Sequence, residues 1–381
     1  MNIKHNCPIL RSTIACVTIS ACGLSLNGLT FAASPAKTDP AKVADAINRA
    51  ADFLKKAQAK DGSFSSSTGP GVTAIVAASL LKSGRPTTDP VVAAALKYLE
   101  GNVHEDGGIY QQGGNHKNYE TCLAIVAFAE ANKDKKYDKL LANAEKFVKK
   151  EQWDDGENKK ADDVNFGGAG YGSSSRPDLS NTSFLIDALH AVGRGDDDPA
   201  IQKALIFVSR CQNLESKYNT TEFADKVDDG GFYYTVAAGG SSPAGRTDDG
   251  GLRSYGSMTY AGFKSMIYAG VKQDDPRVKA ALEWIKKNYT LDENPGMGQQ
   301  GLYYYYHTYA KALAALGESE IVDAKGTSHD WRAELADKFL SQQQADGSWS
   351  NKTPRWMESD PNLVTAYALL SLSYCKEAGS K

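Results

Sequence analysis

The chain has 381 residues, 41% of them hydrophobic and 23% charged, a balance that is typical of a globular protein and excludes a largely disordered one. Its 43 basic and 46 acidic side chains give a formal net charge of −3. There is therefore no cationic excess of the kind that binds nucleic acid or an anionic membrane. After residue 33, no apolar stretch is long enough to span a bilayer.

The first 33 residues have the features of a secretory signal. Lys4 and Arg11 precede an apolar, Ser/Thr-rich run that ends in the small residues Ala32 and Ala33. We therefore expect residues 1–33 to be removed and residues 34–381 to fold after export, as a periplasmic, secreted or envelope protein. Removal of two cations leaves 43 − 2 = 41 basic against 46 acidic side chains, a net charge of −5. Ile-Ser-Ala before Cys22 also allows a lipoprotein.

Three cysteines remain after the leader, and their spacing is informative. Cys122, Cys211 and Cys375 are odd in number and far apart, so they form neither a disulfide framework nor a Cys-x-x-Cys metal site. We expect buried free thiols and predict no metal and no cofactor.

Six amphipathic helices are expected along the mature chain. They carry Lys and Glu on one face, and each has an aromatic–aliphatic pair near its end. Four are preceded by Asp-Pro, in which Asp caps free N–H groups and Pro suits the first helical position. They are predicted over residues 43–56, 91–99, 140–150, 201–210, 278–287 and 331–341.

Between them lie six segments that are apolar nearly all round and are therefore expected to be buried helices. Each begins around one threonine. In the first four, Gly or Asn follows eleven residues later, where a left-handed residue would end the helix, whereas the fifth stops earlier, at Gly317. The six threonines, which we call the threonine ladder, are Thr73, Thr121, Thr182, Thr259, Thr308 and Thr365.

This alternation predicts an all-α protein with two concentric rings. Amphipathic helices have one wet face and belong outside, whereas apolar helices must be covered. The first and last copies match each other best, which favours a closed α/α toroid of six outer–inner pairs over an open solenoid. Two long Gly-rich loops, 154–179 and 213–255, are expected at the mouth where the inner helices begin.

Several residues of the repeat resemble the Gln–Trp repeat of squalene and oxidosqualene cyclases, and the six-pair layout is similar to the β subunit of protein prenyltransferases. In four copies, Gln follows the aliphatic residue of the pair by four positions. Gln152 is one of these four glutamines. The residues that match the family repeat are Arg49-Ala50, Phe53-Leu54, Gln58, Gly62 and Phe64, then Lys203-Ala204, Phe207-Val208 and Gln212, and finally Gln344, Gly347 and Trp349. The resemblance implies a terpenoid cyclase-like toroid.

The catalytic motifs of these families are not found in this chain. The cyclase acid motif, Asp-x-Asp-Asp-Thr-Ala, is absent, and Glu120 before Thr121 comes nearest to it. Tyr306-His307-Thr308 matches the zinc-binding His of the prenyltransferases, but Ser257-Met258-Thr259 stands where their Asp-x-Cys ligands would be. One histidine does not make a zinc site. Arg253 aligns with a family arginine that contacts diphosphate.

Candidate site residues are those next to the ladder or in the mouth. His307 is a candidate general base or oriented hydrogen-bonding group, and the alternative is a core histidine. Glu120 is a candidate acid, and the alternative is a structural pair with Lys117 or with a helix N-terminus. Lys264 and Lys311 on inner helices, together with Arg176 and Arg253 in the mouth loops, could hold an anionic group, although each alone would suit a surface role. The candidate ligand-binding residues are Asn181, Arg253, Tyr255, Tyr305, Tyr306 and Lys311.

Three functions are compatible with these features. The first is an exported toroid that binds or transforms a hydrophobic or amphipathic isoprenoid-like molecule in its bore. The second is a non-catalytic envelope binding or scaffold protein that has lost the catalytic motifs, which a narrow bore filled by side chains would support. The third is a polysaccharide lyase or glycosidase that uses Tyr, His and Arg.

The choice between the two leader types can be tested directly. If Cys22 carries a lipid, radiolabelled fatty acid incorporated into the protein should disappear in Cys22→Ser. We expect instead that the mature protein begins near Ser34, by N-terminal mass spectrometry, and is unchanged by this substitution. A label that depends on Cys22 would contradict cleavage at the later site.

Overall fold

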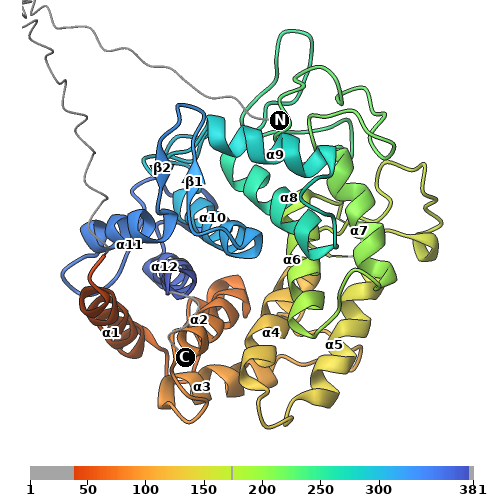
Figure 1. The fold of residues 1–381 in the computed structure, drawn as a ribbon. Coiled ribbons are helices and arrows are strands. Elements are labelled where there is room, and N and C mark those ends of the chain that lie inside the picture. Colours follow the sequence, from red (N-terminus) through yellow and green to blue (C-terminus); the bar gives the residue numbers. More distant parts are fainter. Residues whose placement is uncertain (1–37, 173–174, 377–381) are drawn as a thin grey trace, which may run out of the picture. The chain divides into compact units, whose positions relative to one another are not determined.

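A computed structural model describes residues 38–172 and 175–376. The predicted leader 1–33 and Cys22 lie outside the described residues. Within them, twelve α-helices run once around a ring, and outer and inner helices alternate (Figure 1). The outer helices are α1 (Pro40–Ala57), α3 (Pro90–Glu100), α5 (Asp138–Lys150), α7 (Pro199–Arg210), α9 (Pro276–Lys287) and α11 (Trp331–Gln342). The inner helices are α2 (Gly71–Lys82), α4 (Lys117–Ala131), α6 (Leu179–Ala191), α8 (Gly256–Tyr268), α10 (Leu302–Leu316) and α12 (Pro361–Cys375).

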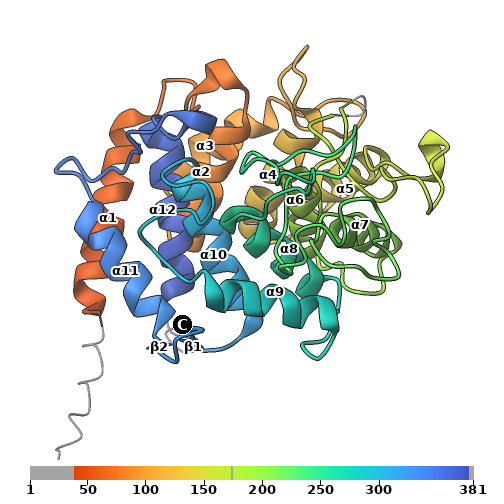
Figure 2. The same cartoon turned by 90° about the horizontal axis from the view of Figure 1, so that it is seen from above.

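The ring is closed, as the sequence predicts. α12 packs against α2, and α1 contacts both α11 and α12, so the last pair meets the first. Figures 1 and 2 both show the blue end of the chain beside the orange beginning. The all-α toroid of six outer–inner pairs is therefore confirmed for the described residues.

Short elements complete the described chain. Three 3₁₀ turns lie in outer-to-inner loops, at Ser66–Thr68, Asp155–Glu157 and Arg355–Met357. An antiparallel hairpin, which the helical pattern did not predict, joins α10 to α11; in it β1 (Ile321–Val322) pairs with β2 (Ser328–His329). Each described helix is too short or too polar to be a candidate for crossing a membrane.

Local chemistry explains where the outer helices begin. Asp39, Asp89, Asp198 and Asp275 each accept a hydrogen bond from a backbone N–H of the first turn, and Pro follows each of them. The inner helices are buried on nearly every face, so the hydrophobic core is shared by the two rings. Gly84, Gly193 and Gly270 have positive φ at inner-helix ends, but Asn132, with φ −91°, does not.

The threonine ladder attaches loops to inner helices. In five copies the threonine Oγ1 accepts a hydrogen bond from a backbone N–H of its own outer-to-inner loop, at 2.9–3.1 Å. The donors are Phe64, Ile109, Ala169, Phe232 and Trp349, in chain order. Since these amides are buried, they would otherwise lack a partner, so the threonine is structural.

The repeat glutamines join neighbouring copies. Gln58 Nε2 donates to Gly62 O in its own loop and to Val91 O of the next outer helix, at 3.0 and 2.9 Å. Gln152 and Gln212 make the same two kinds of bond. The glycine beside each bond packs on the next outer helix: a Cβ on Gly62 would lie 2.3 Å from Ala94 O. Only glycine fits so close to a backbone.

The last copy corrects one position. The prediction placed its repeat glutamine at Gln344, but Gln343 makes the two bonds, to Gly347 O and to Ala46 O of α1, at 2.9 and 2.8 Å. Gln344 donates to Ser350 instead and is exposed. In both copies the bridging glutamine stands four residues after the buried member of the aromatic–aliphatic pair. That member is Leu54 in α1 but Phe339 in α11, so counting from Leu340 gave a position one residue too late.

The fifth copy corrects a second position. Thr308 Oγ1 donates to Tyr305 O in its own helix instead of accepting from the loop. The outward-facing place near the start of α10 belongs to Tyr305, whose hydroxyl donates to Thr290 O at 2.7 Å. Thr308 therefore does not make the loop contact of the other ladder threonines, although the sequence pattern places it in the ladder.

The bridging role of Gln343 can be tested with its neighbour as control. We expect Gln343→Ala to lower the free energy of unfolding by about 1–3 kcal/mol, because two backbone carbonyls that close the ring lose their donor. Gln344→Ala should cost well under about 1 kcal/mol, since its side chain is exposed. Equal losses in a urea titration would contradict the assignment.

Candidate functional site

The inner helices place their bore-facing side chains in layers. Contacts across the bore define these layers, because the rings that meet stand at different offsets along their helices. Tyr119 stands two residues before its ladder threonine, whereas Phe184 and Tyr367 stand two residues after theirs.

An aromatic layer crosses the bore near the mouth; it consists of Tyr119 of α4, Phe184 of α6, Tyr304 of α10 and Tyr367 of α12. Ring centroids are 5.2 Å apart for Tyr119 and Phe184, 6.1 Å for Phe184 and Tyr304, and 5.9 Å for Tyr304 and Tyr367. Ser180 Oγ also lies 2.9 Å from Tyr304 Oη. Because α8 stands between α6 and α10 in the ring, these contacts reach across the bore.

His307 lies against this layer. Its ring stacks on Tyr367 with centroids 5.6 Å apart, and the residue is only 7% exposed. Nδ1 is buried and has no hydrogen-bond partner among the described residues. Burial, assisted by the charge of Lys311, lowers the pKa of His307 to about 3. The ring is thus neutral near pH 7, a weak base but a competent hydrogen-bonding group.

A charged layer lies one turn deeper; it consists of Asp187 of α6, Lys264 of α8 and Lys311 of α10. Lys264 Nζ is 2.5 Å from Asp187 Oδ1 and 2.7 Å from Ser183 Oγ, and Lys311 Nζ is 2.7 Å from Asp187 Oδ2. Burial lowers the pKa of Lys264 to about 8, although Asp187 opposes this. Burial disfavours ionised Asp187 too, but the two lysines outweigh it and hold its pKa at about 2.

Glu120 is placed apart from His307, between the loops of the first two copies. It is 2% exposed, and its Oε2 accepts a hydrogen bond from Gln111 N at 2.8 Å. Burial raises the pKa of Glu120 to about 7 against the effect of that bond. The alternative of a pair with Lys117 is not what the structure has, since Lys117 Nζ lies 4.8 Å from the centre of the Tyr110 ring.

Asn181 and Tyr255 lie at the mouth with Asp178, the N-cap of α6. Asn181 Nδ2 donates to Asp178 Oδ2 at 2.8 Å, while the buried Asn181 Oδ1 has no partner among the described residues. Burial raises the pKa of Asp178 to about 6. Tyr255 is 2% exposed, and burial together with the nearby Tyr304 raises its hydroxyl pKa. These groups border the aromatic layer.

Three of the predicted ligand-binding residues lie away from the bore. The hydroxyls of Tyr305 and Tyr306 donate to Thr290 O and Leu291 O, at 2.7 and 2.6 Å, and so tether α10 to the loop after α9. Arg253 is exposed in the fourth loop, where its Nε donates to Arg246 O.

Sequence reasoning missed Tyr119 and Asp187. An Asp five residues after a ladder threonine, at the same offset as Lys264, was the available signal.

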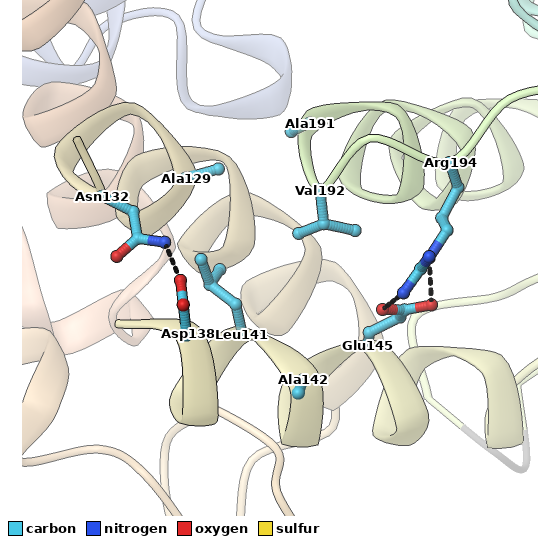
Figure 3. A pocket seen from close by; sticks show the side chains of 9 residues that line it. All are labelled: Ala129, Asn132, Asp138, Leu141, Ala142, Glu145, Ala191, Val192 and Arg194. Carbon is cyan, nitrogen blue, oxygen red and sulfur yellow. Dashed lines mark hydrogen bonds and ion pairs between the residues drawn. The ribbon is translucent and has the colours of Figure 1, made fainter. Parts of the chain in front are cut away.

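A separate hollow of about 310 Å³ opens between α4, α5 and α6, away from the mouth (Figure 3). Its polar lining is already paired: Arg194 donates twice to Glu145, and Asn132 donates to Asp138. None of the bore groups lines it. Among residues 38–172 and 175–376, no three His, Cys, Asp or Glu side chains are grouped as metal ligands.

The raised pKa of Glu120 predicts a pH-dependent stability. Its folded carboxyl holds a proton up to about pH 7, whereas the ordinary value is 4.5, so ionisation costs stability as pH rises through this window. We expect Glu120→Gln to gain about 2 kcal/mol over the wild type between pH 4.5 and 7.5. A difference in unfolding free energy that stays constant with pH would contradict this.

Comparisons with known structures identify the fold. A glycosyl hydrolase of family 88 from Bacteroides vulgatus has a TM-score of 0.54 at 10% identity, over 88% of this chain and 98% of that chain. A polysaccharide lyase has a TM-score of 0.53 at 10% identity, over 88% and 96%. The type II terpene cyclase MstE from Scytonema, without ligand, has a TM-score of 0.49 at 16% identity, over 87% and 97%. At these identities the first two show a shared toroid and no more.

Sequence comparison points to one family. Residues 65–236 match the family model of the squalene-hopene cyclase C-terminal domain. No curated protein matches the chain significantly. The matched stretch holds the inner helices α2, α4 and α6, two repeat glutamines and the residues Glu120, Asn181 and Asp187. The resemblance inferred from the Gln–Trp residues is thus confirmed, and residues 65–236 are similar in sequence to this cyclase family.

Proposed function

We propose that this protein is an exported toroid that binds a hydrophobic or amphipathic, isoprenoid-like molecule at the aromatic layer of its bore. The observation that carries the proposal is the aromatic layer itself, with the unpartnered His307 Nδ1 beside it. Aromatic faces suit unsaturated hydrocarbon chains, and a buried polar atom without a partner costs free energy unless a ligand or water satisfies it. The family match supports the ligand class, and the leader pattern supports export.

The chemistry of the site favours binding over cyclisation. Protonation of an alkene requires a strong acid, and burial makes Glu120 a weaker acid than usual. No second carboxylate pairs with it among its described contacts, and His307 is neutral. The groups available near the bore can therefore orient a ligand by hydrogen bonds, but they do not supply the acid that the cyclase reaction needs.

A scaffold without a ligand is the second candidate, and one observation favours it. Side chains of α6 and α10 meet across the bore in both layers, at Phe184–Tyr304 and at Asp187–Lys311. A ligand would have to displace some of these contacts. The lyase or glycosidase alternative has only the shared fold in its favour, because Tyr305 and Tyr306, which it would use, are hydrogen-bonded to loop carbonyls.

Lipid extraction and titration separate these candidates. We expect an isoprenoid-like lipid in extracts of the purified protein, and binding of geranylgeraniol by calorimetry. Phe184→Ala should weaken that binding about tenfold, since it removes one aromatic contact in the bore. Tyr306→Phe, which removes a hydroxyl on the outer side of α10, should leave the affinity unchanged. Absence of both extracted lipid and measurable binding would favour the scaffold.

A further inference from the structure

The charged layer contains one more positive charge than negative. Lys264, Asp187 and Lys311 come from three inner helices, and their side chains are 3%, 5% and 13% exposed. Two ammonium groups share one carboxylate, so the layer carries a net charge of +1 when all three are ionised. Burying an uncompensated charge is costly, and a buried charge is normally paired.

Among residues 38–172 and 175–376, the groups near this layer do not supply the missing negative charge. At the far ends of α2 and α4, Lys82 pairs with Glu130, so that pair is neutral. Burial lowers the pKa values of His307 and His190, and a histidine is at most a further cation. Asp178 lies at the mouth, at the start of α6, and its oxygens accept hydrogen bonds from Asn181.

The same region has unused hydrogen-bond donors. An ammonium group has three N–H bonds. Lys264 uses two of them, on Asp187 and Ser183, and Lys311 uses one, on Asp187. His307 stands four residues before Lys311, on the same face of α10, and its Nδ1 can also carry a proton. Donors on two helices therefore lie at the boundary between the charged and aromatic layers.

We propose that the molecule bound in the bore carries a single anionic group of the carboxylate class, held by Lys264, Lys311 and His307, with its hydrocarbon part against the aromatic layer. This proposal rests on the proposed function and deepens it by naming the head group. The single negative charge of a carboxylate would balance the net charge of +1 on the charged layer, whereas a diphosphate would give the layer a net negative charge. The bound carboxylate would accept from Lys311 Nζ and from His307 Nδ1–H, the donors without a full set of partners.

The test compares an acid and an alcohol with the same chain. We expect geranylgeranoic acid to bind at least tenfold more tightly than geranylgeraniol at pH 7, by calorimetry. Lys311→Met should bring the two affinities within about twofold of each other by weakening only the acid. It should fold, because the remaining Lys264–Asp187 pair is neutral. Lys286→Met, on the outer helix α9, is the matched control and should keep the preference.

The outcomes separate the two proposals. If acid and alcohol bind equally to the wild type, the anionic head group is overturned and isoprenoid binding stands. If neither binds, the proposed function fails, and acetate then tests the anion site alone. Acetate should raise the melting temperature of the wild type more than that of Lys311→Met at equal ionic strength. An equal rise in both proteins overturns the anion site as well.

Discussion

Closure of the ring depends on satisfying backbone groups that are buried between the copies. Five outer-to-inner loops contain a buried residue next to an inner helix, and the backbone N–H of that residue needs a partner inside the protein. Thr Oγ1 accepts from the loop amide, and the glutamine Nε2 joins the loop carbonyl to the next outer helix. The bond from Gln343 to Ala46 O does the same between the last copy and the first, where α12 also packs against α2.

The fifth copy departs from this scheme, and the departure shapes the bore. Without a ladder threonine in place, Tyr305 and Tyr306 reach outward to the carbonyls of Thr290 and Leu291. These two bonds set the rotation of α10 about its axis. Because side chains three and four positions apart share a helix face, Tyr304, His307 and Lys311 then point into the bore. The fifth copy therefore contributes Tyr305 and Tyr306 to the scaffold, and Tyr304, His307 and Lys311 to the bore.

Electrostatics divide the bore into two parts. Towards the mouth, burial raises the pKa values of Glu120 and Asp178 and so favours the protonated, neutral form of these two carboxyl groups. Deeper in, Asp187 stays ionised because two lysines outweigh its burial. An apolar region next to a cationic one suits an amphipathic molecule with an acidic end, and it offers no strong acid for alkene chemistry.

The sequence alone determined the fold, because the alternation of amphipathic and apolar helices and the spacing of Gln58, Gly62 and Thr73 reflect local and nearest-neighbour constraints. It also indicated Glu120, Asn181, His307 and Lys311 as polar groups on inner helices. Tertiary structure decided which of them meet. The placement of α10 involves hydrogen bonds from Tyr305 and Tyr306 to the outer-to-inner loop of their own pair, and these bonds follow tyrosines where the other copies use the ladder threonine, so the threonine spacing does not reveal them. The partnership of Asp187 with Lys264 and Lys311 joins residues 77 and 124 positions apart and requires α6, α8 and α10 to be packed around the bore.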